Sequence, residues 1–219
     1  RRQRQMCIRD RYGVLAIVII GILGIPASSF IAVLSAAGLT IGLAFQGSLS
    51  NFAGGVLILL FKPFKIGDFV KEDVHGNEGL VEGIDLFYTR MRTFDNKIVI
   101  IPNGSLANTS ITNYTANNKR RIEIKVGISY DSDMKRAKDI LMNVINSQDG
   151  ILKNEDNKVY VDALEESQIT IGTMAWVMTD DYWKIKWELT EKFKNALDDA
   201  GIEIPFNQLS VTINEKQRK

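Results

Sequence analysis

Residues 12–61 read YGVLAIVIIGILGIPASSFIAVLSAAGLTIGLAFQGSLSNFAGGVLILLF and contain no charged side chain. A helix needs about 20 apolar residues to cross the hydrocarbon core of a bilayer. This run is therefore long enough for two crossings, and Pro26 with the small residues after it marks a break between them. A cleavable signal peptide does not explain the run, because its apolar region spans only about 7–15 residues. The stretch predicts a protein that enters a membrane.

Basic residues flank the apolar run at both ends and predict its orientation. Arg9 and Arg11 precede the first apolar helix, and Lys62 and Lys65 follow the second. Because lysine and arginine beside membrane helices favour the cytoplasmic side, both ends belong inside the cell and the turn belongs outside. We therefore expect a multi-pass protein of the plasma (inner) membrane whose C-terminal domain is cytoplasmic.

The beginning of the chain is expected to be incomplete. Residues 1–10 read unlike the rest of the sequence and are interpreted as a non-native leader. Residues 11–25 then form only a partial membrane helix, since this length corresponds to roughly 22 Å. At least one earlier membrane helix is expected to be missing.

The second apolar segment, residues 28–47, is rich in small residues and is the predicted pore helix. A helix that only faces lipid is typically rich in Leu, Ile and Val, whereas small residues let helix backbones approach closely. The small residues form two rows, Gly38-xxx-Gly42 and Ala32-xxx-Ala36-xxx-Thr40. Two rows on neighbouring faces fit a ring of identical helices, while one row alone would also fit a simple dimer.

Two large residues of this segment fall on one face. Leu39 and Leu43 are four positions apart and therefore stack, roughly in line with Ala32 and Ala36. In a ring they would form two apolar collars around the axis, and a narrow apolar constriction excludes water and blocks ions. Contact with lipid is the alternative for both leucines.

The length of the segment predicts a bend. A straight helix from residue 28 to residue 61 would be about 51 Å long, well beyond the bilayer core. Gly47, followed by Ser48, is the expected hinge. Residues 48–61 are then expected to form an interfacial helix along the cytoplasmic membrane surface.

Three motifs carry a family resemblance. They are AAGLTIGLAFQGSLSN at residues 36–51, FKPFKIGD at 61–68 and IIPNG at 100–104. The chain from Arg11 onward resembles the small-conductance mechanosensitive channel (MscS) family. The resemblance implies a homoheptamer whose pore helices kink at Gly47 and whose hydrophobic gate is formed by leucines. By the resemblance, the gate residues are Leu39 and Leu43. One packing face of the pore helix consists of Ala32, Ala36 and Thr40, and the other consists of Ser35, Gly38 and Gly42.

The chain departs from that family in two respects. Ser35 and Thr40 are bulkier and more polar than the Ala and Gly that are commonest at these packing positions. Each hydroxyl is able to hydrogen-bond back to its own helix, so close packing is compatible with both residues. By the same resemblance, we expect the family's first membrane helix and much of its second to be missing from this sequence.

The residues after the apolar run predict two cytoplasmic units and a tail. Residues 62–118 show short β-rich runs between turn signals, at 66–70, 79–84, 87–93 and 97–101, typical of a small β-barrel or sandwich. Residues 119–207 alternate between strand and helix patterns, with helices at 134–147 and from Asp180 to Ala200, typical of an α+β domain. Residues 208–219 are a C-terminal strand and tail. The strand, 209–213, has no partner nearby in the sequence, and the resemblance implies that copies of it close a barrel.

No catalytic, cofactor or metal site is expected, and we do not expect an enzyme. His75 is the only histidine and has neither a Cys nor a second His beside it, so it is assigned to a surface turn. Asp131 and Asp133 are explained more simply as helix caps than as cation ligands. Cys7 has no adjacent base.

Two further sets of residues are given structural roles. The glycosylation sequons begin at Asn103, Asn108 and Asn113. Because the predicted topology places them in the cytoplasm, we assign them to loops or helix starts. The three tryptophans are interpreted as core or subunit contacts: Trp176, Trp183 and Trp187.

The expected function is a mechanosensitive ion channel that opens under membrane tension and releases ions and small solutes during hypoosmotic shock. Its partners would be membrane lipids, permeating ions and solutes, and other copies of the chain. The net charge of +1 argues against a nucleic-acid partner. The alternative is a membrane-anchored cytoplasmic binding or regulatory module without conductance, which predicts a dimer at most.

Overall fold

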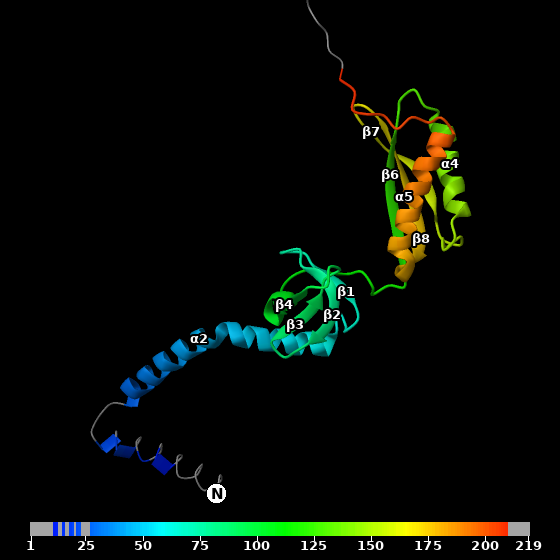
Figure 1. Ribbon diagram of the computed structural model, residues 1–219. Coiled ribbons are helices and arrows are strands. Elements are labelled where there is room, and N and C mark those ends of the chain that lie inside the picture. The colour runs from blue at the N-terminus through cyan, green and yellow to red at the C-terminus, as the bar shows by residue number, and fades with distance from the viewer. Residues whose placement is uncertain (1–10, 13–14, 16–17, 20, 23–26, 210–219) are drawn as a thin grey trace, which may run out of the picture. The chain divides into compact units, whose positions relative to one another are not determined.

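The computed structural model describes residues 11–12, 15, 18–19, 21–22 and 27–209. These residues belong to two compact units that divide after Asn113. The first contains a long helix and a five-stranded sheet, and the second contains a three-stranded sheet with two helices (Figure 1). The expected leader lies outside the described residues, as do most of the partial helix and all but the first residue of the expected C-terminal strand.

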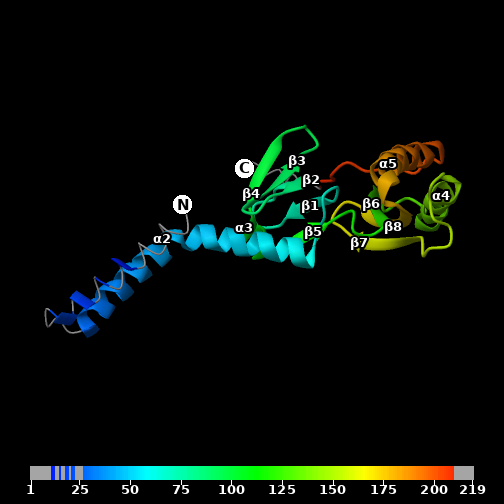
Figure 2. The same cartoon turned by 90° about the horizontal axis from the view of Figure 1, so that it is seen from below.

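The long helix of the first unit is α2 (Ala27–Phe61, 35 residues). It continues without interruption through Gly47, and its axis changes direction part-way along in both views (Figures 1 and 2). It ends at Phe61, because Lys62 has a φ of 50°, which is not helical, and Pro63 has no backbone N–H to extend a helix. The bend agrees with a helix too long for one straight crossing, while the hinge at Gly47 stays a prediction.

The sheet of the first unit is antiparallel throughout and has the strand order β4-β3-β2-β1-β5. Its strands are β1 (Phe69–Glu72), β2 (Glu78–Ile84), β3 (Tyr88–Arg92), β4 (Ile98–Pro102) and β5 (Ile111–Asn113). The buried core combines strand residues with residues from α2, the turn after it and α3. The strands contribute Val70, Val81, Met91 and Ile101, and the other three are Ile58, Phe64 and Leu106. Side chains of successive strand residues thus alternate between the core and the opposite face, as in any half-buried sheet.

Two features of this unit differ from the sequence prediction. The first strand begins three residues later than expected, because Lys65 to Asp68 form a turn. In that turn the Lys65 N–H donates to Asp68 Oδ2 at 2.9 Å, and Gly67 adopts a φ of +95°. The short helix α3 (Asn103–Ala107) and strand β5 were not anticipated as elements.

The second unit is a three-stranded antiparallel sheet of order β6-β8-β7 with two helices on one face (Figures 1 and 2). Its elements are β6 (Lys119–Ile128), α4 (Met134–Ser147), β7 (Lys158–Leu164), β8 (Ile169–Met178), the 3-10 turn η1 (Thr179–Asp181) and α5 (Tyr182–Asp199). Asp133 caps α4 as expected, since its carboxylate accepts the N–H groups of Lys135 and Arg136. The second helix begins later than expected, because Asp180 and Asp181 lie in η1.

The two helices of the second unit bury one stripe each. In α4 the buried residues are Ala137, Leu141 and Ile145, four positions apart, and α5 buries a similar stripe that includes Leu189 and Phe193. Both stripes lie in one core with the sheet. The outer side of α5 carries Trp183 and Trp187, which are 42% and 66% exposed. A core role for these two tryptophans was therefore wrong, and a role as subunit contacts stays a prediction.

Candidate pore helix and its attachment to the β domain

The first part of α2 is not covered by any of the other described residues. Apart from the half-buried Phe30, every side chain from residue 28 to residue 50 is exposed, including Leu39 (65%) and Leu43 (62%). Within the described residues α2 is the one helix long and apolar enough to span a membrane, with a mean hydropathy of 1.9. So large an apolar surface is not stable in water, so lipid or further protein must cover it.

The predicted packing residues all lie on this exposed part. A Cβ atom at Gly38 or Gly42 would meet no other atom within 4 Å, so no contact among the described residues explains why these positions are glycine. The same holds for Gly47. Ala32, Ser35, Ala36 and Thr40 are likewise exposed on the helix.

Thr40 is the polar member of the second small row. Its hydroxyl donates to the Ala36 carbonyl at 2.8 Å, as the sequence led us to expect. The side chain is thereby satisfied within its own helix. Its polarity therefore does not prevent an apolar neighbour from approaching.

The second part of α2 is attached to the β domain by close backbone contact. A Cβ atom at Gly54 would lie 2.5 Å from the Asn103 carbonyl oxygen, and one at Gly55 would lie 2.2 Å from the Leu86 carbonyl oxygen. Neither position therefore accommodates a side chain unless the backbone moves. Nearby, the Gly104 N–H donates to Asn51 Oδ1 at 3.0 Å, which joins the helix to α3. Sequence reasoning missed this attachment, although a Gly-Gly pair inside a helical pattern is a signal of close approach.

Asn103 lies on the β-domain side of the contact with α2, and its hydrogen bonds hold that side together. Its side chain is fully buried, its amide donates to the Asp85 carbonyl at 2.8 Å, and its oxygen accepts the Thr89 hydroxyl at 2.7 Å. Its backbone N–H also donates to the Phe87 carbonyl. The residue is the first of α3, in keeping with the expected helix-start role.

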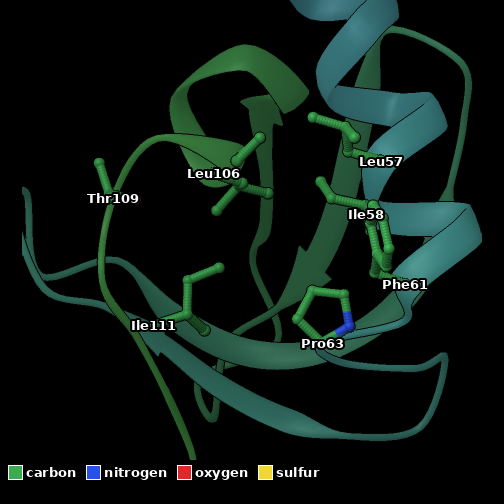
Figure 3. A pocket seen from close by; sticks show the side chains of 8 residues that line it. Leu57, Ile58, Phe61, Pro63, Leu106, Thr109 and Ile111 are labelled. Carbon is green, nitrogen blue, oxygen red and sulfur yellow. The ribbon is translucent and has the colours of Figure 1, made fainter.

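An apolar hollow of about 420 Å³ lies beside this attachment. Leu57 and Ile58 of α2 project into it opposite Leu106 and Ile111 of the β domain (Figure 3). Thr109 also lines it, and among the described residues its buried hydroxyl oxygen has no hydrogen-bond partner. The helix is therefore held to the β domain by a few specific contacts beside a hollow.

Comparison with known proteins identifies the family. The β-domain model of mechanosensitive ion channels matches residues 47–116, and the MscS C-terminal model matches residues 122–204. An MscS family protein of Buchnera aphidicola subsp. Baizongia pistaciae is 41% identical over 209 residues, which are 94% of this chain and 74% of that protein. The chain belongs to the MscS family.

Two channels within the family extend the comparison. The small-conductance mechanosensitive channel of Edwardsiella ictaluri is 43% identical over 204 residues, covering 92% of this chain and 71% of that protein. The crystal structure of Helicobacter pylori MscS in its closed state is 33% identical, with a TM-score of 0.84 over 93% of this chain and 80% of that chain. The MscS chain thus shares with that structure a fold made of an N-terminal helix, a β domain and a C-terminal domain. It is a membrane protein and a mechanosensitive channel.

Proposed function

We propose that this MscS chain forms a homoheptameric channel that opens under membrane tension and releases ions and small solutes during hypoosmotic shock. The observation that carries the proposal is the exposed first part of α2. It presents two rows of small residues and a pair of leucines that no other described residue covers. Identical copies arranged in a ring would cover the small rows and turn the leucines toward a common axis.

In the closed state the small rows pack tightly, and the Leu39 and Leu43 collars hold the axis dry. Tension favours whichever state occupies the larger area in the membrane plane. The helices then tilt and separate, and the collars widen until water enters. Tension shifts this equilibrium only through its different effect on the two states, which is the tension multiplied by the change in area.

The attachment to the β domain fits this mechanism. Gly54, Gly55 and Asn51 hold the second part of α2 against the domain, whereas the part before Gly47 makes no such contact with the described residues. The proposed hinge therefore lies between a held segment and a free one. Motion of the free segment opens the pore, while the held segment stays with the β domain along the cytoplasmic membrane surface.

The remaining topology follows the charges that flank the apolar run. Lys62 and Lys65 place the end of α2 at the cytoplasmic side, so both later units are cytoplasmic and the protein crosses the membrane more than once. In the ring, the five-stranded sheet serves as a small barrel or sandwich, and the strand at 209–213 pairs with its copies. Membrane lipids surround the outer faces of the helices.

Patch-clamp recording under stepped suction tests this function, with the full-length protein in a host that lacks its own tension-gated channels. We expect stepwise currents whose open probability rises with tension. Silence at every tension below membrane rupture, from protein shown to be in the membrane, would contradict the proposal and favour an anchored regulatory module. We also expect light scattering to give the mass of a heptamer for the protein in mild detergent.

A further inference from the structure

A polar hollow in the second unit lies between the end of α4 and the side of α5. Its volume is about 340 Å³, at the lower end of the roughly 300–1,000 Å³ that is common for ligand pockets. The turn from Gln148 to Gly150 forms one wall, and residues 181–192 form the other. Five charged side chains border it: Asp149, Asp181, Lys184, Glu188 and Lys192.

Gln148 is the buried group of this hollow, with an exposed fraction of 4%. Its amide nitrogen donates to Glu188 Oε2 at 2.7 Å and to the Asp149 carbonyl at 3.2 Å. Its amide oxygen accepts from Lys192 Nζ, also at 2.7 Å. One neutral amide therefore holds a carboxylate and an ammonium group at its two ends.

That arrangement keeps opposite charges from pairing. Glu188 and Lys192 are four residues apart in the order that ordinarily gives a helical ion pair, yet each bonds to the amide instead. Lys184, one turn before Glu188, also has no ion pair among the described residues. Further along the same helix, Lys194 and Asp198 do pair. At Glu188 and Lys192, the bonds to the Gln148 amide take the place of a helical ion pair.

The wall opposite α5 is fixed in place. Gly150 has a φ of +85°, and a Cβ atom there would lie 2.6 Å from Ile185 Cδ1, so the turn fits closely against the helix. After the turn, Ile151 forms a bridge with Val177, and the Leu152 N–H donates to the Trp176 carbonyl at 2.8 Å. The turn, and with it the bonded Gln148 amide, is thus held in position before any ligand arrives, which lowers the entropic cost of binding.

We propose that this hollow binds a small zwitterion of the α-amino acid type. Lys184 and Lys192 receive the ligand's carboxylate, while Glu188 and Asp149 receive its ammonium group. Charge-assisted hydrogen bonds of this kind are stronger than neutral ones. A simple anion would satisfy only the lysines, and a simple cation only the carboxylates, so a ligand that carries both charges fits best. No described group of His, Cys, Asp and Glu residues is suited to a metal ion.

The test is a saturation-transfer NMR titration of the full chain in detergent with three probes of similar size. L-alanine carries both charges, N-acetyl-L-alanine carries only the carboxylate, and L-alaninamide carries only the ammonium group. We expect saturable binding of L-alanine with a Kd on the order of 1 mM. Each single-charge probe is expected to bind at least about tenfold more weakly, because it loses one set of charge-assisted bonds.

Matched variants locate the site. Lys184→Gln and Glu188→Gln should each weaken L-alanine binding about tenfold. Lys153→Gln removes the same charge as Lys184→Gln from an exposed position that does not line the hollow, and it should bind as the parent does. Three results would each overturn the proposal: no saturable binding of L-alanine, equal binding of the three probes, or equal effects of Lys184→Gln and Lys153→Gln. The binding result does not depend on whether the chain forms a tension-gated pore, because binding is measured without tension.

Discussion

The side chain of Leu43 contributes to the proposed gate through its apolar surface alone. Replacing Leu43 with serine removes most of that surface and adds a hydroxyl that holds water. We expect the L43S channel to leak or to open at lower tension, because the dry state loses about 1–3 kcal/mol per subunit. The measurement is the ratio of the tension threshold of the variant to that of the parent in the same patch.

Leu34 provides a matched control for this change. It lies nine positions before Leu43, which places it on nearly the opposite side of the helix, and it is similarly exposed in the single chain. L34S should therefore leave the threshold near that of the parent. If L43S gated like the parent, or if both variants shifted the threshold equally, Leu43 would not be the barrier.

Glu72 is a buried carboxylate at the end of β1. It is 1% exposed, accepts the backbone N–H groups of Val74 at 2.9 Å and His75 at 3.0 Å, and lies 3.2 Å from the His75 ring. Burial raises the pKa of Glu72, but the bonds from His75 and Val74 outweigh burial and hold the pKa below its usual value. The ionised form therefore stabilises the turn that follows β1. This contribution is present above the unfolded pKa of about 4.3 and is lost as the pH falls through the lower pKa of the folded state.

Replacing Glu72 with glutamine tests that contribution. The amide keeps one acceptor oxygen but replaces the other with an NH2 group, which cannot accept from the His75 N–H, and it removes the charge that strengthens both bonds. At neutral pH local opening should therefore be easier by about 1–3 kcal/mol. The measurement is amide hydrogen exchange across residues 73–77, with variant and parent compared at the same pH. The difference should shrink as the pH falls below the unfolded pKa of about 4.3 and through the lower pKa of the folded state, where the parent carboxylate becomes protonated. E78Q, at an exposed position in β2, should show no such difference at either pH.

At the scale of elements, the small rows of α2 determine whether neighbouring helices approach. Gly38 has open space around it in the single chain, so a larger residue there does not disturb the helix itself. G38L should nevertheless prevent close packing between copies, and the discrete oligomer should be lost in size-exclusion chromatography with light scattering. Ala37→Leu adds bulk outside both small rows and should leave the oligomer intact. An unchanged oligomer in G38L would rule out this row as the contact.

The elements that the sequence predicted best are those whose pattern is local. Helix α4 matched its predicted bounds, because its buried stripe and the cap at Asp133 are both contained in one short segment. Strand β1 was misplaced because the turn before it depends on Asp68, whose carboxylate competes with strand formation. The short elements α3 and β5 have no period of their own, and neighbouring strands hold them in place.

The candidate site divides in the same way. The small rows and the leucines of α2 could be predicted from the sequence, because residues on one face of a membrane helix recur at regular intervals. The bond from Gly104 to Asn51 spans 53 positions, and no local pattern indicates it. The polar hollow beside Gln148 was also missed, because it brings together a turn and a helix that are 40 residues apart.

At the scale of the whole molecule, the division after Asn113 predicts that the second unit folds alone. Its core contains 17 buried residues, all of them from β6 onward, and α4 and α5 cover one face of its sheet. Residues 114–219 expressed separately should therefore unfold in urea in one cooperative transition, as domains under about 150 residues usually do. Tryptophan fluorescence follows it, since all three tryptophans lie in this unit.

A substitution at Leu189 tests whether the urea transition reports on the core of the second unit. It is 0% exposed at the middle of α5, so Leu189→Ala should lower the unfolding free energy by about 2–5 kcal/mol with little change in the urea dependence. Thr190→Ala, at the neighbouring exposed position, should change it by less than about 0.5 kcal/mol. A non-cooperative transition for residues 114–219, or equal effects of the two variants, would mean that the second unit depends on the first for its core. The two units would then be separate in their contacts but not in their folding. The β domain and the second unit would unfold together, as one cooperative structure.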